Sequence, residues 1–419
     1  MKKWLCMLLL LCLPLAALAE PQDVLDAFLN RNYALVESML SDEVRAMIGA
    51  EELKQAWEGQ LALLGDEVSL HEYSQQGGAH VFTLLHENGA QNLIVVLDGN
   101  GRVTTLLLQP AVVELAQDRA LPDGVTETDA LLFAATPREL SAKILRPAAE
   151  NAPYAVLVQG SGPSDMDETI GANKPLRDLA DQLAALGVGS IRFDKVTFAH
   201  PELPCETVEQ EYLEPVAEAL RVLKETTGAE QVYVIGHSQG GMLMPWLVQR
   251  CGFDGGAALA GTPMKLWEIS YRQNLDLIAL MPSEQQAALL AQVEAERERA
   301  ENLAQMTDEE ARQSVAFGMN AYYLKHMSAL DAIAIAKEAG KPMLFLWGEN
   351  DVQVSREAFE AWQEGLGDAQ LYSYRSFPGL NHLFMPSDCS ATIASVTAEY
   401  SVPSRMDAAV AQTVAEWIK

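Results

Sequence analysis

Two hydrophobic periods divide the chain into parts. Apolar residues recur every three to four positions within EELKQAWEGQLALL (residues 51–64), and residues 21–65 are expected to be helical. From residue 68 the period becomes two, and VSLHEYS, AHVFTLLHE and QNLIVVLDGNGRVTTLLLQP are typical of consecutive strands. The DGNG sequence at 98–101 predicts a tight hairpin turn. Helices followed by an antiparallel sheet predict a small α+β domain over residues 20–115.

The rest of the chain alternates strands with helices. A polar stretch near residues 121–128 comes first, and the apolar segments YAVLVQG, GSIRF, VYVIG, GGAALAG and PMLFLWG follow, separated by helical patterns such as LRDLADQLAALG. Continuous apolar strands with intervening helices predict a doubly wound, mostly parallel sheet in an α/β domain over residues 126–419. The helical connection over about residues 262–335 is too long for a loop, so we expect an inserted cap or lid there.

The first residues have the layout of a secretory signal peptide. Lys2 and Lys3 precede an apolar stretch at residues 4–15, and Ala17-Leu18-Ala19 offers a small-residue cleavage site. No later segment contains the roughly 20 uncharged apolar residues that a membrane span needs. We therefore expect residues 1–19 to be cleaved near Ala19 and the protein to be secreted or periplasmic, without a membrane span.

Acidic residues dominate the charge of the chain. There are 58 Asp and Glu against 29 Lys and Arg, which gives a net charge of −29. Such a field repels nucleic acids and anionic membranes and disfavours a strongly anionic substrate. A neutral ester or amide would be unaffected, so the charge is compatible with a small uncharged substrate.

The cysteines permit little cross-linking. Once the signal peptide is removed, Cys205, Cys251 and Cys389 remain, so the chain can form at most one internal disulfide. A Cys205–Cys251 pair is one option that the sequence does not decide. No CxxC or His-rich spacing indicates a metal site, and we expect neither a metal nor another cofactor.

The segment VIGHSQGGM places a serine between glycines, where an apolar strand ends and a helix begins. Residues 236–240 match G-x-S-x-G, the nucleophile elbow. The turn is so tight that the positions two before and two after the serine must lack side-chain bulk. It lifts the hydroxyl of Ser238 above the sheet edge and directs the backbone N–H of Gln239 toward a developing oxyanion. Ser238 is therefore the predicted nucleophile.

A serine hydroxyl needs a general base that a carboxylate holds in place. Enzymes with this elbow carry the serine, the acid and the histidine in that order along the chain. Only His326 and His382 follow Ser238, and His326 lies in the helical insertion, so His382 in the loop FPGLNHLF is the predicted base. The acid should follow the strand PMLFLWG, where we choose Asp351 over Glu349 because Glu349 follows the strand too closely.

A second oxyanion donor should come from a loop after an early strand. VLVQGSGPSDMDETIG supplies a Gly-rich turn in which the N–H of Ser161 can approach a substrate, since Gly160 and Gly162 leave room; an ordinary strand-to-helix turn is the alternative. The charged residues nearby are expected to brace this region by local hydrogen bonds and ion pairs: Asp165, Asp167, Glu168 and the pair Asp194–Lys195.

Together these motifs resemble the serine esterases of the α/β-hydrolase superfamily. The segments GSGPSDMDETIGANKPLRDLA, IRFDK, GHSQGGM, GENDVQV and LNHLF carry the resemblance over about residues 126–419. It is strongest to bacterial carboxylesterases with an N-terminal extension and a helical cap. Met166 departs from the arginine that relatives often carry, and DKVTF lacks the arginine that usually follows DK. Residues 20–115 resemble the NTF2-like accessory domains that precede some secreted hydrolases.

The resemblance implies a Ser238–Asp351–His382 triad, an oxyanion hole of the Ser161 and Gln239 amides, and a small-molecule ester substrate. The sequence thus predicts a secreted serine hydrolase that cleaves short-chain carboxylic esters through an acyl-enzyme intermediate. A serine peptidase or amidase on the same fold is one alternative, although no acidic pair marks an anchor for a peptide terminus. A catalytically inactive cell-surface binding protein is another, against which the intact order of the triad argues. The sequence gives no oligomeric state.

Overall fold

The computed structural model describes residues 20–86, 89–111, 119–367, 370–387 and 391–419. The predicted signal peptide at residues 1–19 and Cys389 lie outside these residues. The chain divides after residue 113 into two compact units, which are described separately. Among the described residues, no helix has the length and apolar character that a membrane span requires.

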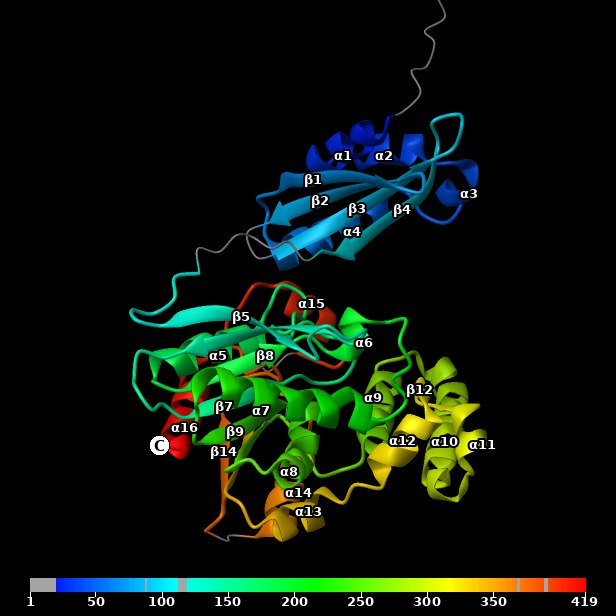
Figure 1. Ribbon diagram of the computed structural model, residues 1–419. Coiled ribbons are helices and arrows are strands. Elements are labelled where there is room, and N and C mark those ends of the chain that lie inside the picture. Colours follow the sequence, from blue (N-terminus) through cyan, green and yellow to red (C-terminus); the bar gives the residue numbers. More distant parts are fainter. Residues whose placement is uncertain (1–19, 87–88, 112–118, 368–369, 388–390) are drawn as a thin grey trace, which may run out of the picture. The chain divides into compact units, whose positions relative to one another are not determined.

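The first unit combines helices with an antiparallel sheet (Figure 1). The described helices are α1 (Pro21–Leu29), α2 (Tyr33–Met39), α3 (Asp42–Arg45) and α4 (Ala50–Leu64). They precede β1 (Ser69–Gln76), β2 (Ala79–His86), β3 (Gly89–Leu97) and β4 (Val103–Pro110), which pair in the order β1-β2-β3-β4. Alternate residues of β2 and β3, such as Phe82 and Leu93, meet the apolar sides of the helices. The rings of Trp57 and Phe28 pack against each other in this core, with their centroids 4.9 Å apart and their planes inclined by 35°.

The second unit is built on an eight-stranded sheet in the order β14-β13-β10-β9-β7-β8-β6-β5. The β5–β6 and β6–β8 pairs are antiparallel, and every other neighbouring pair is parallel. The predicted α/β fold with a mostly parallel sheet is therefore confirmed. The strands are β5 (Thr126–Leu132), β6 (Leu140–Arg146), β7 (Tyr154–Val158), β8 (Gly189–Phe193), β9 (Val232–His237), β10 (Gly256–Leu259), β13 (Met343–Gly348) and β14 (Tyr372–Phe377).

Helices cover both faces of this sheet, which explains the unbroken apolar runs of its central strands. Val156 of β7 faces a core that includes α7 (Glu214–Thr227), α8 (Gln239–Cys251) and α14 (Arg356–Leu366). The next residue, Leu157, faces a second core with α5 (Pro175–Ala185) and α16 (Ala408–Ile418). The remaining elements of this part are α6 (Val196–Ala199), the π-helical turn η1 (Glu209–Leu213) and α15 (Val396–Ser401). Cys205 and Cys251 are both free thiols.

A mainly helical segment interrupts the sheet between β10 and β13. It contains α9 (Leu266–Ala279), α10 (Ser283–Glu301), η2 (Leu303–Gln305), α11 (Asp308–Arg312), the short ribbon β11 (Val315–Ala316) and β12 (Met319–Asn320), α12 (Ala321–Ser328) and α13 (Ala332–Ala339). Figure 1 shows α9 to α12 gathered at one end of the unit. The segment has a small core of its own around Trp267 and Leu324.

Candidate active site

Ser238 occupies a strained turn between β9 and α8. Its φ of 50° and ψ of −115° lie where residues with a side chain rarely occur, as a nucleophile elbow requires. A Cβ added to Gly236 would overlap the backbone carbonyl of Gly240, and one added to Gly240 would lie 2.6 Å from the carbonyl oxygen of Gln159. The flanking glycines are therefore needed for backbone packing, and the serine remains half-buried.

Asp351 and His382 form a buried pair. The Nδ1 atom of His382 lies 2.7 Å from Oδ2 of Asp351. The other carboxylate oxygen, Oδ1, accepts hydrogen bonds from the backbone N–H groups of Gln353 (2.8 Å) and Val354 (2.9 Å). Both side chains are almost fully buried, so the orientation of the carboxylate is fixed and Oδ2 is directed at the imidazole.

The two residues that the sequence disfavoured lie elsewhere. Glu349 accepts a hydrogen bond from the hydroxyl of Ser376 at 2.7 Å. His326 lies on α12 in the inserted segment, with its Nδ1 3.7 Å from a carboxylate oxygen of Glu209. The structure therefore brings His382 together with Asp351 rather than with Glu349.

The loop that carries His382 adjoins the serine turn. The ring of His237, the residue before Ser238, lies 4.8 Å from the ring of His382, centroid to centroid. Within the described residues, Ser238 Oγ and the imidazole of His382 make no hydrogen bond to each other. In enzymes without substrate such contacts are often long and shorten when the substrate binds.

The Gly-rich loop after β7 passes beside Ser238. A Cβ placed on Gly160 would lie 3.0 Å from the Cβ and 3.5 Å from the Oγ of Ser238. The backbone N–H groups of Ser161 and Gln239 donate to no atom of the residues that the structure describes. Two free N–H groups close to a serine hydroxyl are the donors that an oxyanion needs.

A buried ion pair, which sequence reasoning missed, joins the loop, the elbow and the histidine. Oε1 of Glu168 accepts from the N–H of Gly160 (2.6 Å) and lies 2.9 Å from Nδ1 of His237. Nε2 of His237 lies 2.9 Å from the backbone carbonyl oxygen of His382. Because both ring nitrogens face acceptors, both carry a proton and His237 is an imidazolium.

The electrostatic surroundings agree with that protonation state. Burial alone would lower the pKa of His237, but the negative charge of Glu168 and the two hydrogen bonds outweigh it, and the pKa is raised. The available signals in the sequence were the histidine of GHSQG and the glutamate of DMDETIG, neither of which indicates its partner.

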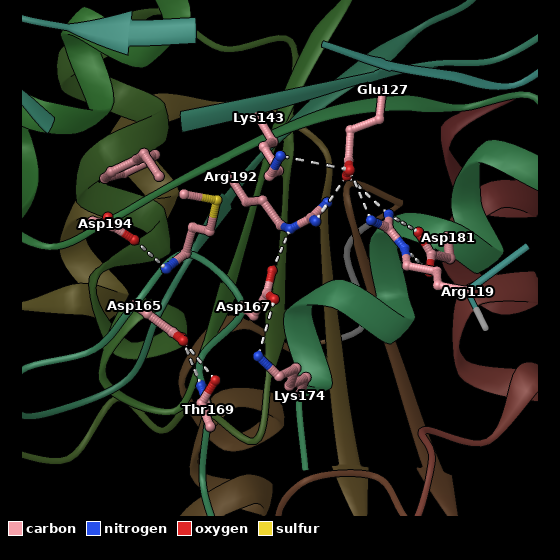
Figure 2. Close-up of polar contacts among 12 residues, drawn as sticks. Arg119, Glu127, Lys143, Asp165, Asp167, Thr169, Lys174, Asp181, Arg192 and Asp194 are labelled. Carbon is pink, nitrogen blue, oxygen red and sulfur yellow. Dashed lines mark hydrogen bonds and ion pairs between the residues drawn. The ribbon is translucent and has the colours of Figure 1, made fainter. Parts of the chain in front are cut away.

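Charged residues also hold the Gly-rich loop after β7 by hydrogen bonds to its backbone and side chains (Figure 2). Asp165 accepts from the backbone N–H (2.8 Å) and the hydroxyl (2.6 Å) of Thr169, and Asp194 accepts from the N–H of Met166 at 2.8 Å. The predicted local role of Asp165 is confirmed. Beside these contacts lies a separate line of alternating charges: Lys174, Asp167, Arg192, Glu127, Arg119 and Asp181.

The predicted Asp194–Lys195 ion pair is wrong. Lys195 is instead fully buried and pairs with Glu211, whose Oε1 lies 2.6 Å from the Lys195 Nζ. Adjacent residues of an extended segment point to opposite sides, so Asp194 faces the loop while Lys195 enters the interior.

Comparisons with known proteins identify the family to which the chain belongs. The alpha/beta hydrolase fold family matches residues 196–384. Esterase EstD from Thermotoga maritima is 31% identical over 395 residues, which cover 93% of this chain and 92% of that protein. Among solved structures, the Pyrococcus furiosus esterase Pf2001 has a TM-score of 0.42 and 13% identity over 70% of this chain and 92% of its own. Est1E from Butyrivibrio proteoclasticus has a TM-score of 0.42 and 17% identity, over 65% of this chain and 96% of its own.

The near full-length match to an esterase, together with the fold, shows that the chain belongs to the α/β-hydrolase family. Within that family it is a carboxylesterase-type hydrolase.

Proposed function

We propose that the protein is a serine hydrolase that cleaves short-chain carboxylic esters by way of an acyl-enzyme. Ser238 is the nucleophile, His382 the general base and Asp351 the carboxylate that orients the histidine. The buried Asp351–His382 pair beside the strained serine turn is the observation that carries this proposal.

The reaction follows from the positions of these groups. His382 removes the proton of Ser238 as its Oγ attacks the ester carbonyl carbon, and the N–H groups of Ser161 and Gln239 stabilise the resulting oxyanion. When the tetrahedral intermediate collapses, the ester C–O bond breaks and His382 passes the proton to the leaving alcohol. Water, deprotonated by His382, then releases the acid and restores the free serine.

Removal of the serine hydroxyl tests the proposal. Ser238→Ala should lower kcat on p-nitrophenyl acetate by roughly 10⁴-fold or more, as losses of a triad nucleophile do elsewhere. Thr262→Val would serve as a control, because its hydroxyl is bonded to the carbonyl of Ala358 and is not part of the proposed triad. Undiminished turnover by the Ser238 variant would overturn the assignment. Parallel assays of matched esters and aminoacyl amides decide between the esterase and the amidase alternative.

We also propose that the protein is exported after cleavage near Ala19. The charged, apolar and small-residue regions of the first 19 residues support this location. Edman sequencing of protein recovered from the culture fluid or periplasm should begin at residue 20. A chain recovered only from the cytoplasm with residues 1–19 intact would refute export.

Two further parts of the chain, the first unit and the inserted segment, complete the proposal. The first unit resembles an NTF2-like accessory domain in its order of helices followed by an antiparallel sheet. The inserted segment acts as a lid over the acyl group, since Met327 of α12 approaches Gln239 next to the nucleophile, with its Sδ 3.3 Å from the amide Nε2. A series of p-nitrophenyl esters of increasing acyl length should show a sharp fall in kcat/KM where the acyl chain outgrows this space; a flat profile would contradict the lid.

A further inference from the structure

A group of polar side chains lies behind the Gly-rich loop and is not used in the mechanism above; three of them are buried and the fourth, Tyr323, is half-buried. Four residues make up this oxyanion network: Lys195, Glu211, Tyr212 and Tyr323. Burying a lysine and a glutamate is costly, and an apolar pair of the same volume would often serve stability equally well. Their presence directly behind a reactive centre therefore suggests a role in its geometry.

Lys195 is the centre of the network. Its ammonium group has three protons and three acceptors: Oε1 of Glu211 at 2.6 Å, the hydroxyl oxygen of Tyr212 at 2.8 Å and the carbonyl oxygen of Gly160 at 2.9 Å. The hydroxyl of Tyr212 donates in turn to the same Gly160 carbonyl at 2.6 Å. Two donors, one of them cationic, thus hold a single backbone oxygen.

That oxygen belongs to the peptide group whose N–H is the N–H of Ser161. A trans peptide is planar, and its C=O and N–H point in opposite directions. Fixing the Gly160 carbonyl therefore fixes the direction of the Ser161 N–H. A cation at the carbonyl also polarises the peptide and makes its N–H a stronger donor. The N–H of Gly160 itself is bonded to Glu168, so the loop is held on both sides.

Through the inserted segment the network continues to the side chain of Gln239, the residue whose backbone N–H is the other proposed oxyanion donor. The hydroxyl of Tyr323, on α12, donates to Oε2 of Glu211 at 2.5 Å and accepts from Nε2 of Gln239 at 2.8 Å. Burial, and then the negative charge of Glu211, raise the pKa of Tyr323 well above its ordinary value, so the hydroxyl keeps its proton. Glu211 lies in the π-helical turn η1, a type of local distortion that recurs at functional sites.

We propose that the oxyanion network aligns both oxyanion-hole amides, and that α12 of the inserted segment is thereby part of the catalytic apparatus. Its members are positioning residues, because they act through the Gly160–Ser161 peptide and through Gln239. The inference rests on the proposed function, since it assigns the two N–H groups to an oxyanion.

The test uses tyrosine hydroxyls, because Tyr→Phe removes a hydrogen bond with little change of volume. Tyr323→Phe and Tyr212→Phe should each lower kcat on p-nitrophenyl acetate by roughly 10- to 100-fold, less than the loss of an oxyanion donor itself, with KM nearly unchanged. Tyr322→Phe is the matched control: it lies on the same helix, and its hydroxyl makes no hydrogen bond to any residue that the structure describes.

A transition-state analogue separates positioning from general loosening of the fold. A trifluoromethyl ketone forms an oxyanion at the serine, so its inhibition constant should rise in the tyrosine variants in parallel with the fall in kcat/KM. The alcohol product of the matching ester carries no oxyanion, so its inhibition constant should stay unchanged. The proposal is overturned if both variants keep wild-type kcat, if analogue and alcohol weaken equally, or if Tyr322→Phe loses as much activity. The Ser238→Ala assay keeps the two proposals apart. If Ser238→Ala is inactive while both tyrosine variants retain wild-type activity, only the proposal about the oxyanion network is refuted.

Discussion

The bonding of Asp351 makes its replacement by asparagine a sharp test of how His382 is held. In the wild-type protein, Oδ1 of Asp351 accepts two backbone N–H groups and Oδ2 faces Nδ1 of His382. In Asp351→Asn the remaining oxygen must stay with the two N–H donors, so the amide NH₂ faces the histidine. Nδ1 then has to accept a hydrogen bond and lose its proton, which moves the proton to Nε2, the atom that must take it from Ser238.

The magnitude follows from this change of tautomer. The same carboxylate-to-amide replacement in serine hydrolases with such a triad lowers kcat by about 10⁴, or about 5 kcal/mol in the barrier. We expect a comparable loss for Asp351→Asn in initial-rate assays with p-nitrophenyl acetate, with the melting temperature nearly unchanged because the backbone hydrogen bonds persist.

Glu349→Gln is the matched control, since Glu349 bonds to Ser376 and should tolerate the same chemical change with near wild-type kcat. A loss below about tenfold in Asp351→Asn, or an equal loss in Glu349→Gln, would refute the reasoning.

Three further predictions concern the surroundings of the site. Gly236→Ala should destabilise the protein and abolish activity, because the added Cβ overlaps a backbone carbonyl. Gly59→Ala is the control: it lies at an open helical position and should stabilise the protein by up to about 1 kcal/mol. Thermal melts measure both changes in stability, and ester assays measure the activity. The raised pKa of His237 means that its ion pair stabilises the fold fully below about pH 6.5 and less as pH rises through the folded pKa. The melting-temperature gap between wild type and His237→Asn should therefore narrow from pH 6 to pH 9, and a widening gap would contradict the imidazolium. Burial raises the pKa of Cys205 and of Cys251 to about 11, so peptide mapping after brief iodoacetamide treatment at pH 7.5 should find both unmodified; rapid labelling of either would be inconsistent with that burial.

Much of the fold could be predicted because its signals are local. The apolar runs of β7, β9 and β13 indicated strands buried on both faces, and their alternation with helices indicated a parallel sheet. The order of serine, acid and histidine along the chain predicted that the acid follows the strand PMLFLWG, and the distance of each carboxylate from the end of that strand favoured Asp351 over Glu349. Glu349 and Asp351 are two residues apart, yet only Asp351 lies in the turn that directs its side chain at the imidazole.

The buried contacts could not be predicted, because they join residues that no local pattern relates. Lys195 follows Asp194 in the sequence, which suggested an ion pair, but the extended backbone turns the two side chains apart. Its partner Glu211 lies 16 positions further on, in a π-helical turn that has no clear sequence signature. Tyr323 lies in an insertion whose periodicity indicates only helices. Such pairings depend on the tertiary packing of whole elements.

Mass spectrometry of the protein after reaction with a fluorophosphonate tests the central claim most directly. A phosphonyl group should attach once per chain, on the tryptic peptide that contains Ser238, with parallel loss of esterase activity, and Ser238→Ala should remain unlabelled. Labelling of another residue that tracks the loss of activity, or inactivation of the esterase without an adduct on Ser238, would contradict the account.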